Sequence, residues 1–459
     1  MLAADCFANP TDPALDVHGL PASHWPQFSQ QLSPGLQAYA ASQGFKAQAG
    51  RLLHVHGADG GLSRAILGLG EHPSPMLFGA AAAHLPSGNY RLAPGPAGLD
   101  PTQSAIAWAL GAYAFDRYKA KSRAGARLCP PAGADMAEAL RVAQAVYLVR
   151  DLVNTPAGDM GPAALQAMAQ SLADRFGARL EAVIGEDLLA KGYPLVHGVG
   201  RAASEPPRLL HLTWGKDPAA PHICLIGKGV TFDTGGLNMK TGAGMALMKK
   251  DMGGAAHALA LAQLIMDANL PVRLSVLVPI AENSISAVSV RPGDVLISRG
   301  GRSIEITNTD AEGRLILADA LAKACEDTPD LLLDFATLTG AARVALGPDL
   351  VPFYTEEDGL AQALHEAALA VSDPLWRMPL WAAYDSDLDS PIADMRNSGD
   401  GQAGSILAAL FLRRFVTIPN WAHFDIFAWS PKERPARPMG GDATGLRAAW
   451  HMLKARFAQ

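Results

Sequence analysis

The fold is decided around one apolar run that ends in glycines, Ile223-Cys224-Leu225-Ile226-Gly227-Lys228-Gly229. A short apolar run bounded by glycine is typical of a strand that is buried on both faces of a parallel sheet. Residues 331–335 repeat this composition further along the chain. Segments with helical periodicity separate the apolar runs, so we expect an α/β protein.

Strands and helices are expected to alternate on both sides of this run. We expect strands at residues 209–212, 223–226, 272–278 and 331–335, and helices at residues 163–176 and 245–266. Two short runs, residues 294–297 and 302–306, flank Gly300-Gly301, which predicts a hairpin. This order of elements predicts a mixed, mostly parallel sheet with helices on both faces.

The chain has 459 residues, which exceeds one typical domain, so two domains are expected. Residues 1–133 have the pattern of a small α/β domain, with strands at 51–56 and 63–70 and helices at 80–85 and 103–118. The run Pro130-Pro131-Ala132-Gly133 interrupts that pattern. Residues 134–152 are predicted to form a linking helix, and residues 153–459 are predicted to form the larger domain.

Several residues that can carry chemistry follow the ends of predicted strands. In mostly parallel α/β folds, ligands bind outside the carboxyl ends of the strands. Lys228, Asp310 and Thr337 each follow the end of such a strand. We therefore expect these three side chains to lie together.

A second stretch places charged residues at every other position, Asn308-Thr309-Asp310-Ala311-Glu312-Gly313-Arg314. In extended backbone, alternate residues point to the same side of the chain. Asp310, Glu312 and Arg314 are therefore expected to converge on one spot. The apolar run at residues 315–321 predicts a packed helix that holds this loop in place.

Four carboxylates and three cations near these loops need a common explanation; they are Asp233, Asp251, Asp310, Glu312, Lys228, Lys240 and Arg314. Carboxylates that lie close together cannot all stay ionised without compensation. Two bound divalent cations would supply this compensation. The alternative is a purely structural network of salt bridges, but the glycine-rich setting of the loops favours the metal site.

These seven residues, in this order and spacing, resemble the leucyl aminopeptidase (cytosol aminopeptidase) family of dinuclear metallo-exopeptidases. The resemblance extends from Arg150 to the C-terminus and includes Ala336-Thr337-Leu338-Thr339-Gly340. It implies that the larger domain is catalytic and that the smaller one is the family's variable domain, which supports assembly. It also implies a homohexamer that hydrolyses the N-terminal residue from peptides with a free N-terminus.

The resemblance further implies a set of metal ligands. Lys228, Asp233, Asp251 and Glu312 would hold the tighter metal, and Asp233, Asp310 and Glu312 the more exchangeable one. Lys228 must be neutral to coordinate, so the neighbouring dications have to depress its pKa. Zinc is the family's usual metal, and the oxygen-rich set also suits manganese or magnesium at the exchangeable position.

Catalytic and substrate-binding roles are implied in the same way. A metal-bridging water would attack the peptide carbonyl, and Lys240 would stabilise the developing oxyanion. Arg314, with backbone near Gly313 and Leu315, would hold a bicarbonate that takes the water's proton. The expected substrate-binding residues are Met248, Asn308, Thr337, Leu338, Gly340 and Phe427.

Phe427 departs from the family pattern, because the best-known members usually carry a small residue at this position. A phenyl ring that points into the pocket would remove volume and narrow the preference for the first side chain. The alternative is that Phe427 turns into the core and that leucine stays favoured.

His423 and Asp425 match no catalytic position of the family, and we interpret His423 as a structural residue.

Composition limits the partners and the compartment. The net charge is −6 and the chain has no long basic run, which disfavours nucleic acid as the main partner. A DNA-binding architectural role, which some family members also perform, is the competing hypothesis. Four scattered cysteines, the lack of a signal-peptide pattern at residues 1–5 and the lack of a bilayer-spanning apolar stretch predict a cytoplasmic protein without a membrane partner.

Overall fold

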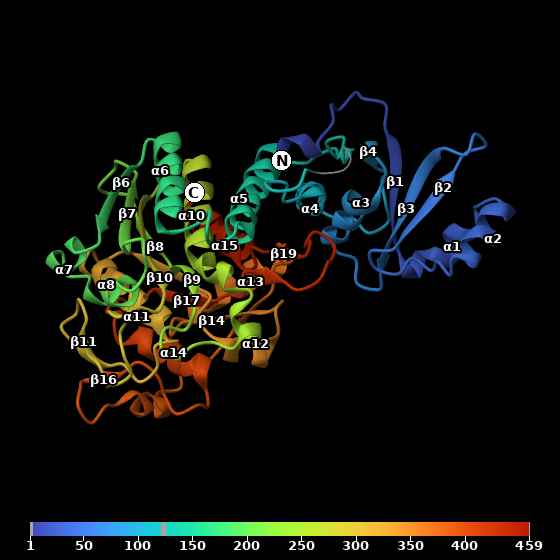
Figure 1. Cartoon of the computed structure of the whole chain (residues 1–459). Coiled ribbons are helices and arrows are strands. Elements are labelled where there is room, and N and C mark those ends of the chain that lie inside the picture. Colours follow the sequence, from blue (N-terminus) through green and yellow to red (C-terminus); the bar gives the residue numbers. More distant parts are fainter. Residues whose placement is uncertain (1–2, 121–124, 459) are drawn as a thin grey trace. The chain divides into compact units, whose positions relative to one another are not determined.

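The computed structural model describes residues 3–120 and 125–458, which form two compact units (Figure 1). The units comprise Met1–Tyr147 with Ser430–Gly440, and Leu148–Trp429 with Gly441–Gln459. The change from one unit to the other falls within helix α5 (Met136–Asn154). Residues 1 and 2 belong to the stretch in which we expected no signal peptide, and they lie outside the described residues. Residue 459, the last of the larger predicted domain, also lies outside them. The exact domain limits stay a prediction.

The first unit is built on a five-stranded sheet with the order β2-β3-β1-β4-β5. Its strands are β1 (Leu15–Pro21), β2 (Leu52–His56), β3 (Leu62–Gly70), β4 (Gly88–Leu92) and β5 (Ala126–Leu128). Its helices are α1 (Trp25–Gln30), α2 (Pro34–Ser42), α3 (Phe78–His84) and α4 (Pro101–Ala112). The strands predicted at 51–56 and 63–70 are confirmed and pair antiparallel. The helix predicted at 103–118 ends earlier, because Tyr113 has extended backbone with ψ 137°.

The second unit is organised by a nine-stranded sheet with the order β15-β14-β17-β13-β8-β10-β7-β6, and β9 also pairs with β10. Its strands are β6 (Arg179–Ile184), β7 (Arg208–Trp214), β8 (His222–Gly227), β9 (Gly229–Asp233), β10 (Arg273–Asn283), β13 (Leu331–Ala336), β14 (Val351–Tyr354), β15 (Leu375–Arg377) and β17 (Trp421–Asp425). The central strands β17, β13, β8 and β10 run parallel, whereas β6 with β7, β7 with β10 and β14 with β17 pair antiparallel. The prediction of a mixed, mostly parallel sheet is confirmed.

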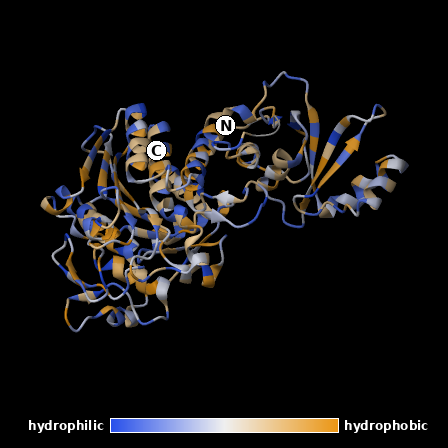
Figure 2. Ribbon diagram, viewed as in Figure 1, coloured by the Kyte–Doolittle hydropathy of each residue, from blue (hydrophilic) through white to orange (hydrophobic). Residues whose placement is uncertain are grey.

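Helices cover both faces of this sheet, as the alternating side chains of β13 show. Leu332 and Ala336 belong to the core that contains α11 (Glu312–Glu326). Phe335 points to the other face and stacks on His257 of α10 (Gly253–Asp267), with ring centroids 6.0 Å apart. The other helices are α6 (Pro162–Phe176), α7 (Asp187–Ala190), α8 (Pro194–Gly200), α12 (Gly340–Leu346), α13 (Asp358–Ala370), α14 (Gly404–Arg413) and α15 (Leu446–Phe457). In Figure 2, α6 carries both hydrophobic and hydrophilic residues, as expected for a helix with one buried face.

The single long helix predicted at residues 245–266 is wrong. This segment is divided into α9 (Gly242–Met245), the 3-10 turn η4 (Met248–Met252) and α10. The last of these breaks is followed by a glycine pair at the start of α10, and a Cβ atom on Gly254 would lie 2.1 Å from the carbonyl oxygen of Phe335. Glycine thus lets the start of α10 approach the end of β13 closely, and the 3-10 turn presents Asp251 just before it.

The hairpin predicted around Gly300-Gly301 is confirmed as β11 (Val295–Ile297) and β12 (Ser303–Glu305). Strand β12 also pairs with β16 (Met395–Arg396), so it belongs to a separate three-stranded sheet. The expectation that Asp310 follows a strand of the main sheet is therefore wrong. Asp310 instead lies in the turn between β12 and α11.

Within the described residues, no helix combines the length and the apolar character that a membrane span requires. All four cysteines are buried. Cys224 lies within β8, and burial raises the pKa of its thiol. This thiol is therefore a small core side chain rather than a reactive group.

Candidate metal centre

The candidate metal centre lies where β8 and β9 end beside the turns that precede α10 and α11. Lys228 separates β8 from β9, and Asp233 ends β9. Asp251 lies in the turn η4, and Glu312 is the first residue of α11, two positions after Asp310. Residues distant in sequence meet here because neighbouring strands of the sheet end at the same edge.

The ammonium group of Lys228 is buried among acidic side chains. Its Nζ lies 2.8 Å from Asp251 Oδ2 and 2.9 Å from Glu312 Oε1, and it donates to the carbonyl of Thr337 at 3.0 Å. A Cβ atom on Gly313 would lie 2.7 Å from this Nζ, so only glycine leaves room for it. Burial alone would lower the pKa of Lys228, but the surrounding carboxylates outweigh burial and raise it above its ordinary value.

Lys240 lies between two other carboxylates. Its Nζ is 2.8 Å from Asp233 Oδ2 and 2.6 Å from Asp310 Oδ1. Burial would lower the pKa of Lys240, but the carboxylates of Asp233, Asp310 and Glu312 together outweigh burial and raise it. Asn283, a residue that the sequence analysis missed, ends β10 and donates to Asp233 Oδ1 at 2.8 Å and to the carbonyl of Thr309 at 3.1 Å. Asn283 therefore fixes the position of Asp233 relative to the loop that carries Asp310.

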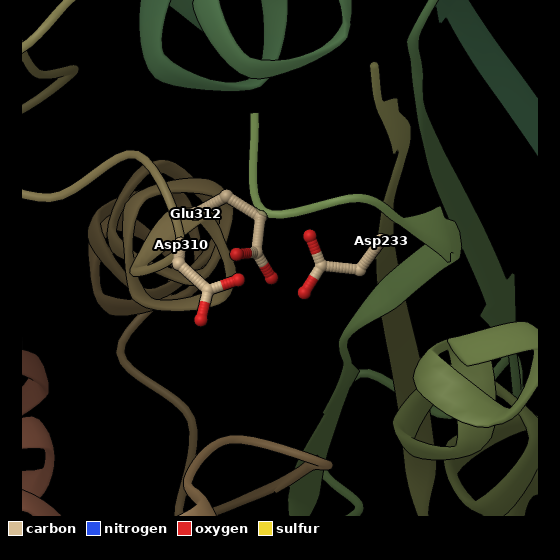
Figure 3. Close-up of side chains that lie close together, drawn as sticks. All are labelled: Asp233, Asp310 and Glu312. Carbon is tan, nitrogen blue, oxygen red and sulfur yellow. The ribbon is translucent and has the colours of Figure 1, made fainter. Parts of the chain in front are cut away.

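Three carboxylates offer oxygen atoms that all lie within 4.8 Å of one another: those of Asp233, Asp310 and Glu312. Figure 3 shows these side chains converging on a common space. Burial, reinforced by the Asp233 carboxylate, raises the pKa of Glu312 to about 8, and burial also raises the pKa of Asp233. Glu312 Oε2 has no hydrogen-bond partner within the described part of the chain. Several hard oxygen donors and one unused buried oxygen fit a divalent cation.

The extended backbone predicted for residues 308–314 is wrong from Glu312 onward, because the helix α11 starts there. Residues two positions apart on a helix do not share a face, so Arg314 diverges from Glu312. Arg314 nevertheless lines the same cavity, and its Nη1 donates to the carbonyl of Asn397 at 2.8 Å. Burial lowers the pKa of Arg314 to about 10, which still leaves the guanidinium protonated at neutral pH.

Asn397 is distant in sequence from the residues that it holds in the site, and the sequence analysis assigned it no role. Its Oδ1 accepts from the backbone N–H groups of Thr307 at 2.9 Å and of Asn308 at 3.2 Å. Its Nδ2 donates to the carbonyl of Asn308 at 2.7 Å. Asn397 thus holds both the loop that carries Asp310 and the guanidinium of Arg314. The only signal in the sequence is its place directly before the glycine-rich turn at residues 398–404.

A cavity of about 510 Å³ brings most of the predicted site residues together. The predicted residues that line it are Lys228, Asp233, Lys240, Met248, Asp251, Asn308, Asp310, Glu312, Arg314, Thr337, Leu338, Gly340 and Phe427. Gly313 and Leu315 do not line it, because Gly313 packs against Lys228 and Leu315 belongs to the core. Their predicted part in bicarbonate binding would therefore have to come from their backbone.

Phe427 is half buried and lines this cavity. Lys250 Nζ lies 4.9 Å from the centre of its ring, and Arg343 Cζ lies 5.6 Å from the same centre. Both cations also line the cavity, and burial lowers the pKa of Lys250 to about 8. The sequence analysis missed both residues, because a lone lysine or arginine is ordinarily a surface residue.

His423 and Asp425 are both fully buried in β17. His423 Nδ1 lies 2.5 Å from Asp334 Oδ1, and Trp421 Nε1 donates to the other oxygen of Asp334 at 2.7 Å. His423 does not line the cavity, in agreement with its interpretation as a structural residue. Asp425 accepts from the backbone N–H and the hydroxyl group of Thr339, and so supports the loop that forms one wall of the cavity.

Comparisons with known proteins account for most of the chain. Residues 147–450 match the cytosol aminopeptidase family, catalytic domain, and residues 18–131 match the M17 aminopeptidase, N-terminal domain. The probable cytosol aminopeptidase of Leifsonia xyli subsp. xyli is 38% identical over 454 residues, which cover 93% of this chain and 90% of the relative.

Solved structures agree with these matches. The crystal structure of the cytosol aminopeptidase from Coxiella burnetii has a TM-score of 0.93 and 44% sequence identity, and covers 99% of this chain and 100% of that chain. A bottromycin maturation enzyme in complex with Mn has a TM-score of 0.85 and 33% identity, and covers 97% and 100% of the two chains. The chain therefore belongs to the M17 cytosol aminopeptidase family and is a metal-dependent aminopeptidase.

Proposed function

We propose that this enzyme hydrolyses the N-terminal residue from peptides at the cavity described above, with two divalent cations held by its acidic cluster. The observation that carries the proposal is the approach of Asp233, Asp310 and Glu312 oxygens within 4.8 Å of one another. Lys240 lies against two of these carboxylates. The cavity thus combines metal ligands, a cation and room for a side chain.

The positions of the side chains support two overlapping ligand sets. Lys228, Asp233, Asp251 and Glu312 would hold one cation; Asp233, Asp310 and Glu312, with the Asp310 carbonyl, would hold the other. Lys228 can offer a nitrogen lone pair only after it loses a proton, and the free carboxylates oppose that loss. The balance reverses once dications neutralise the carboxylates. The oxygen-rich set suits zinc, manganese or magnesium.

The bound cations would supply an activated water and a Lewis acid for the peptide carbonyl. Lys240 is partly exposed to the cavity, with its side chain 17% accessible, so it is placed to donate to a developing oxyanion. Arg314 stays protonated and cannot act as a base. Its role in the proposal is to hold bicarbonate as the proton acceptor, with the backbone of Gly313 and Leu315.

We further propose that Met248, Asn308, Thr337, Leu338, Gly340 and Phe427 bind the substrate. All of them line the cavity. By family resemblance, four of them would surround the first side chain: Met248, Thr337, Gly340 and Phe427. A phenyl ring at the last of these positions reduces the space that remains for that side chain.

Phe427→Ala is expected to shift the preference toward bulky first side chains by about ten- to two-hundred-fold in kcat/KM. Forcing extra volume into a packed site costs about 1–3 kcal/mol, and the substitution removes this cost. The measurement compares Leu, Phe, Met and Ala arylamides with the parent and the variant. The alanine substrate serves as the internal reference, and an unchanged order of preference would exclude Phe427 as a pocket wall.

A screen over aminoacyl-arylamides, with and without added manganese, tests the proposed function directly. Substrates with a free amino group should be hydrolysed, whereas their N-acetylated counterparts should not, because an aminopeptidase recognises the free N-terminus. Hydrolysis of the blocked substrates at the same rate, or no hydrolysis of either set in the presence of metal, would contradict the proposal.

We also propose a homohexamer in the cytosol. Membership of the family supports the hexamer. The cytosolic location is supported by the names of relatives, such as the probable cytosol aminopeptidase of Leifsonia xyli. Light scattering of the purified protein measures the number of subunits, and a mass other than that of six chains would refute the hexamer.

A further inference from the structure

The cavity wall that carries Phe427 also carries two cations that the proposed catalytic steps do not use. Lys250 is only 6% exposed, and its Nζ lies 4.9 Å from the centre of the Phe427 ring. Arg343 Cζ lies 5.6 Å from the same centre. The two positive charges therefore lie beside the same aromatic ring, and both line the cavity.

The carboxylates nearest to Lys250 are engaged elsewhere. Asp251 Oδ2 lies 2.8 Å from Lys228 Nζ, and Asp251 Oδ1 accepts from the hydroxyl of Thr337 at 2.8 Å. Asp425 holds the 338–339 loop and Arg343. Within the described residues, the Lys250 ammonium has neither a hydrogen bond nor an ion pair with another side chain. Arg343 is only partly engaged, because its Nε and Nη1 have no hydrogen-bond partner there.

A largely buried cation that forms no ion pair loses most of its hydration, and the carboxylates nearby compensate this loss only in part. The face of the Phe427 ring recovers only part of this loss. An anion that enters the cavity would complete this compensation, because both cations line it. The position of the two cations decides which part of a substrate can supply that anion, because they contact the ring that belongs to the pocket for the first side chain.

We propose that Lys250 and Arg343 form a subsite for a negatively charged first side chain, so that the enzyme accepts peptides that begin with glutamate or aspartate. This inference rests on the proposed function and names its substrate class. A carboxylate at this part of the cavity wall would accept charge-assisted hydrogen bonds from the Lys250 ammonium and from the unpaired nitrogens of Arg343. The same charges would repel a first side chain of lysine or arginine.

The charge effect is separate from the steric effect of Phe427. The ring limits the size of the first side chain, whereas the cations select its sign. Glutamate and glutamine have nearly the same shape and differ in charge. The ratio of their kcat/KM values therefore measures the effect of the two cations on a charged side chain, separately from the effect of size. A purely steric pocket would treat the two alike.

Lys250→Met tests this subsite. Methionine keeps the length of the side chain without its charge, and an apolar residue in place of an unpaired buried cation is compatible with folding. On arylamide substrates, the parent should prefer glutamate to glutamine. In Lys250→Met, the glutamate-to-glutamine ratio of kcat/KM should fall by about ten- to a hundred-fold, the range expected for a lost hydrogen bond to a charged group.

The adjacent lysine provides a matched control. Lys249 Nζ donates to the carbonyl of Asn154 at 2.6 Å, and Lys249 does not line the cavity. Lys249→Met removes the same charge from the neighbouring position, so it should keep the parent's glutamate-to-glutamine ratio. An equal change of the ratio in both variants would overturn the subsite, because the effect would then not depend on a cation in the cavity.

Binding supplies a readout that does not require turnover. Calorimetry with the manganese-loaded protein should show tighter binding of free L-glutamate than of L-glutamine, and Lys250→Met should lose this difference. A parent that does not distinguish the two amino acids, in binding or in turnover, would also overturn the subsite. Turnover of leucine arylamide by that same parent would show that the proposed aminopeptidase function holds although the subsite does not.

Discussion

Removal of metal is expected to abolish hydrolysis by this aminopeptidase, and added manganese or zinc is expected to restore it. The acidic cluster of Asp233, Asp310 and Glu312 carries no reactive group that could attack a peptide by itself. Without cations, Lys240 is held by two of these carboxylates at 2.8 Å and 2.6 Å rather than left for a substrate. Loss of both the activated water and the Lewis acid should lower kcat by about a thousand-fold or more.

The measurement follows activity and metal content in the same sample during exhaustive chelation. Circular dichroism of the metal-free protein checks that the fold persists, and readdition of manganese checks that the loss is reversible. Magnesium binds a nitrogen ligand such as Lys228 more weakly than zinc does, so it should restore less activity than zinc. Full activity in a sample whose metal content has reached zero would refute the dinuclear site.

The sheet could be predicted from the sequence because its strands depend on local composition. The run at residues 223–226 is apolar on both faces, and the run at 331–335 is apolar except for Asp334. Each becomes a central strand with helices on both sides. Charged residues that directly follow such strands meet at one edge of the sheet. Lys228 and Thr337 were placed together for this reason, and their hydrogen bond of 3.0 Å agrees with the expectation.

The breaks in regular structure could not be predicted, because tertiary contacts cause them. Residues 245–266 have helical periodicity, but α10 begins only at Gly253, where Gly254 packs closely against the carbonyl oxygen of Phe335. The expected alternation of Asp310, Glu312 and Arg314 failed because α11 begins at Glu312. The loop before it is held by Asn397, which is 89 residues away from Asn308. No local pattern in the sequence predicts a hydrogen bond between residues so far apart.

The two cations beside Phe427 also could not be predicted from the sequence, because their positions depend on tertiary contacts. Lys249 and Lys250 are adjacent and chemically identical in the sequence. The 3-10 turn η4 sends one ammonium group toward the carbonyl of Asn154 and the other to the ring of Phe427. Periodicity within an expected α-helix does not predict which of the two lysines faces a cavity, so only the structure distinguishes their roles.

Asp251→Ala is expected to lose bound metal, whereas Arg314→Ala is expected to keep its metal and lose turnover. Asp251 belongs to the cluster around Lys228, at 2.8 Å from its Nζ, so its removal takes away a proposed metal ligand. Arg314 is bound instead to the carbonyl of Asn397 at 2.8 Å. If it holds the proton acceptor, its loss should lower kcat by about a hundred- to ten-thousand-fold, the usual range for general acid–base catalysis.

Metal analysis, kcat and the response to added bicarbonate distinguish the two roles. Arg314→Ala should recover part of its turnover at high bicarbonate concentration, and Asp251→Ala should not. Because Arg314 is buried, Arg314→Met, which keeps most of the side-chain volume, controls for a packing defect, and the melting temperature of each variant is measured alongside. Equal loss of metal in Asp251→Ala and in both Arg314 variants would make Arg314 a structural residue, and the proposed proton transfer would then need another acceptor site in the cavity.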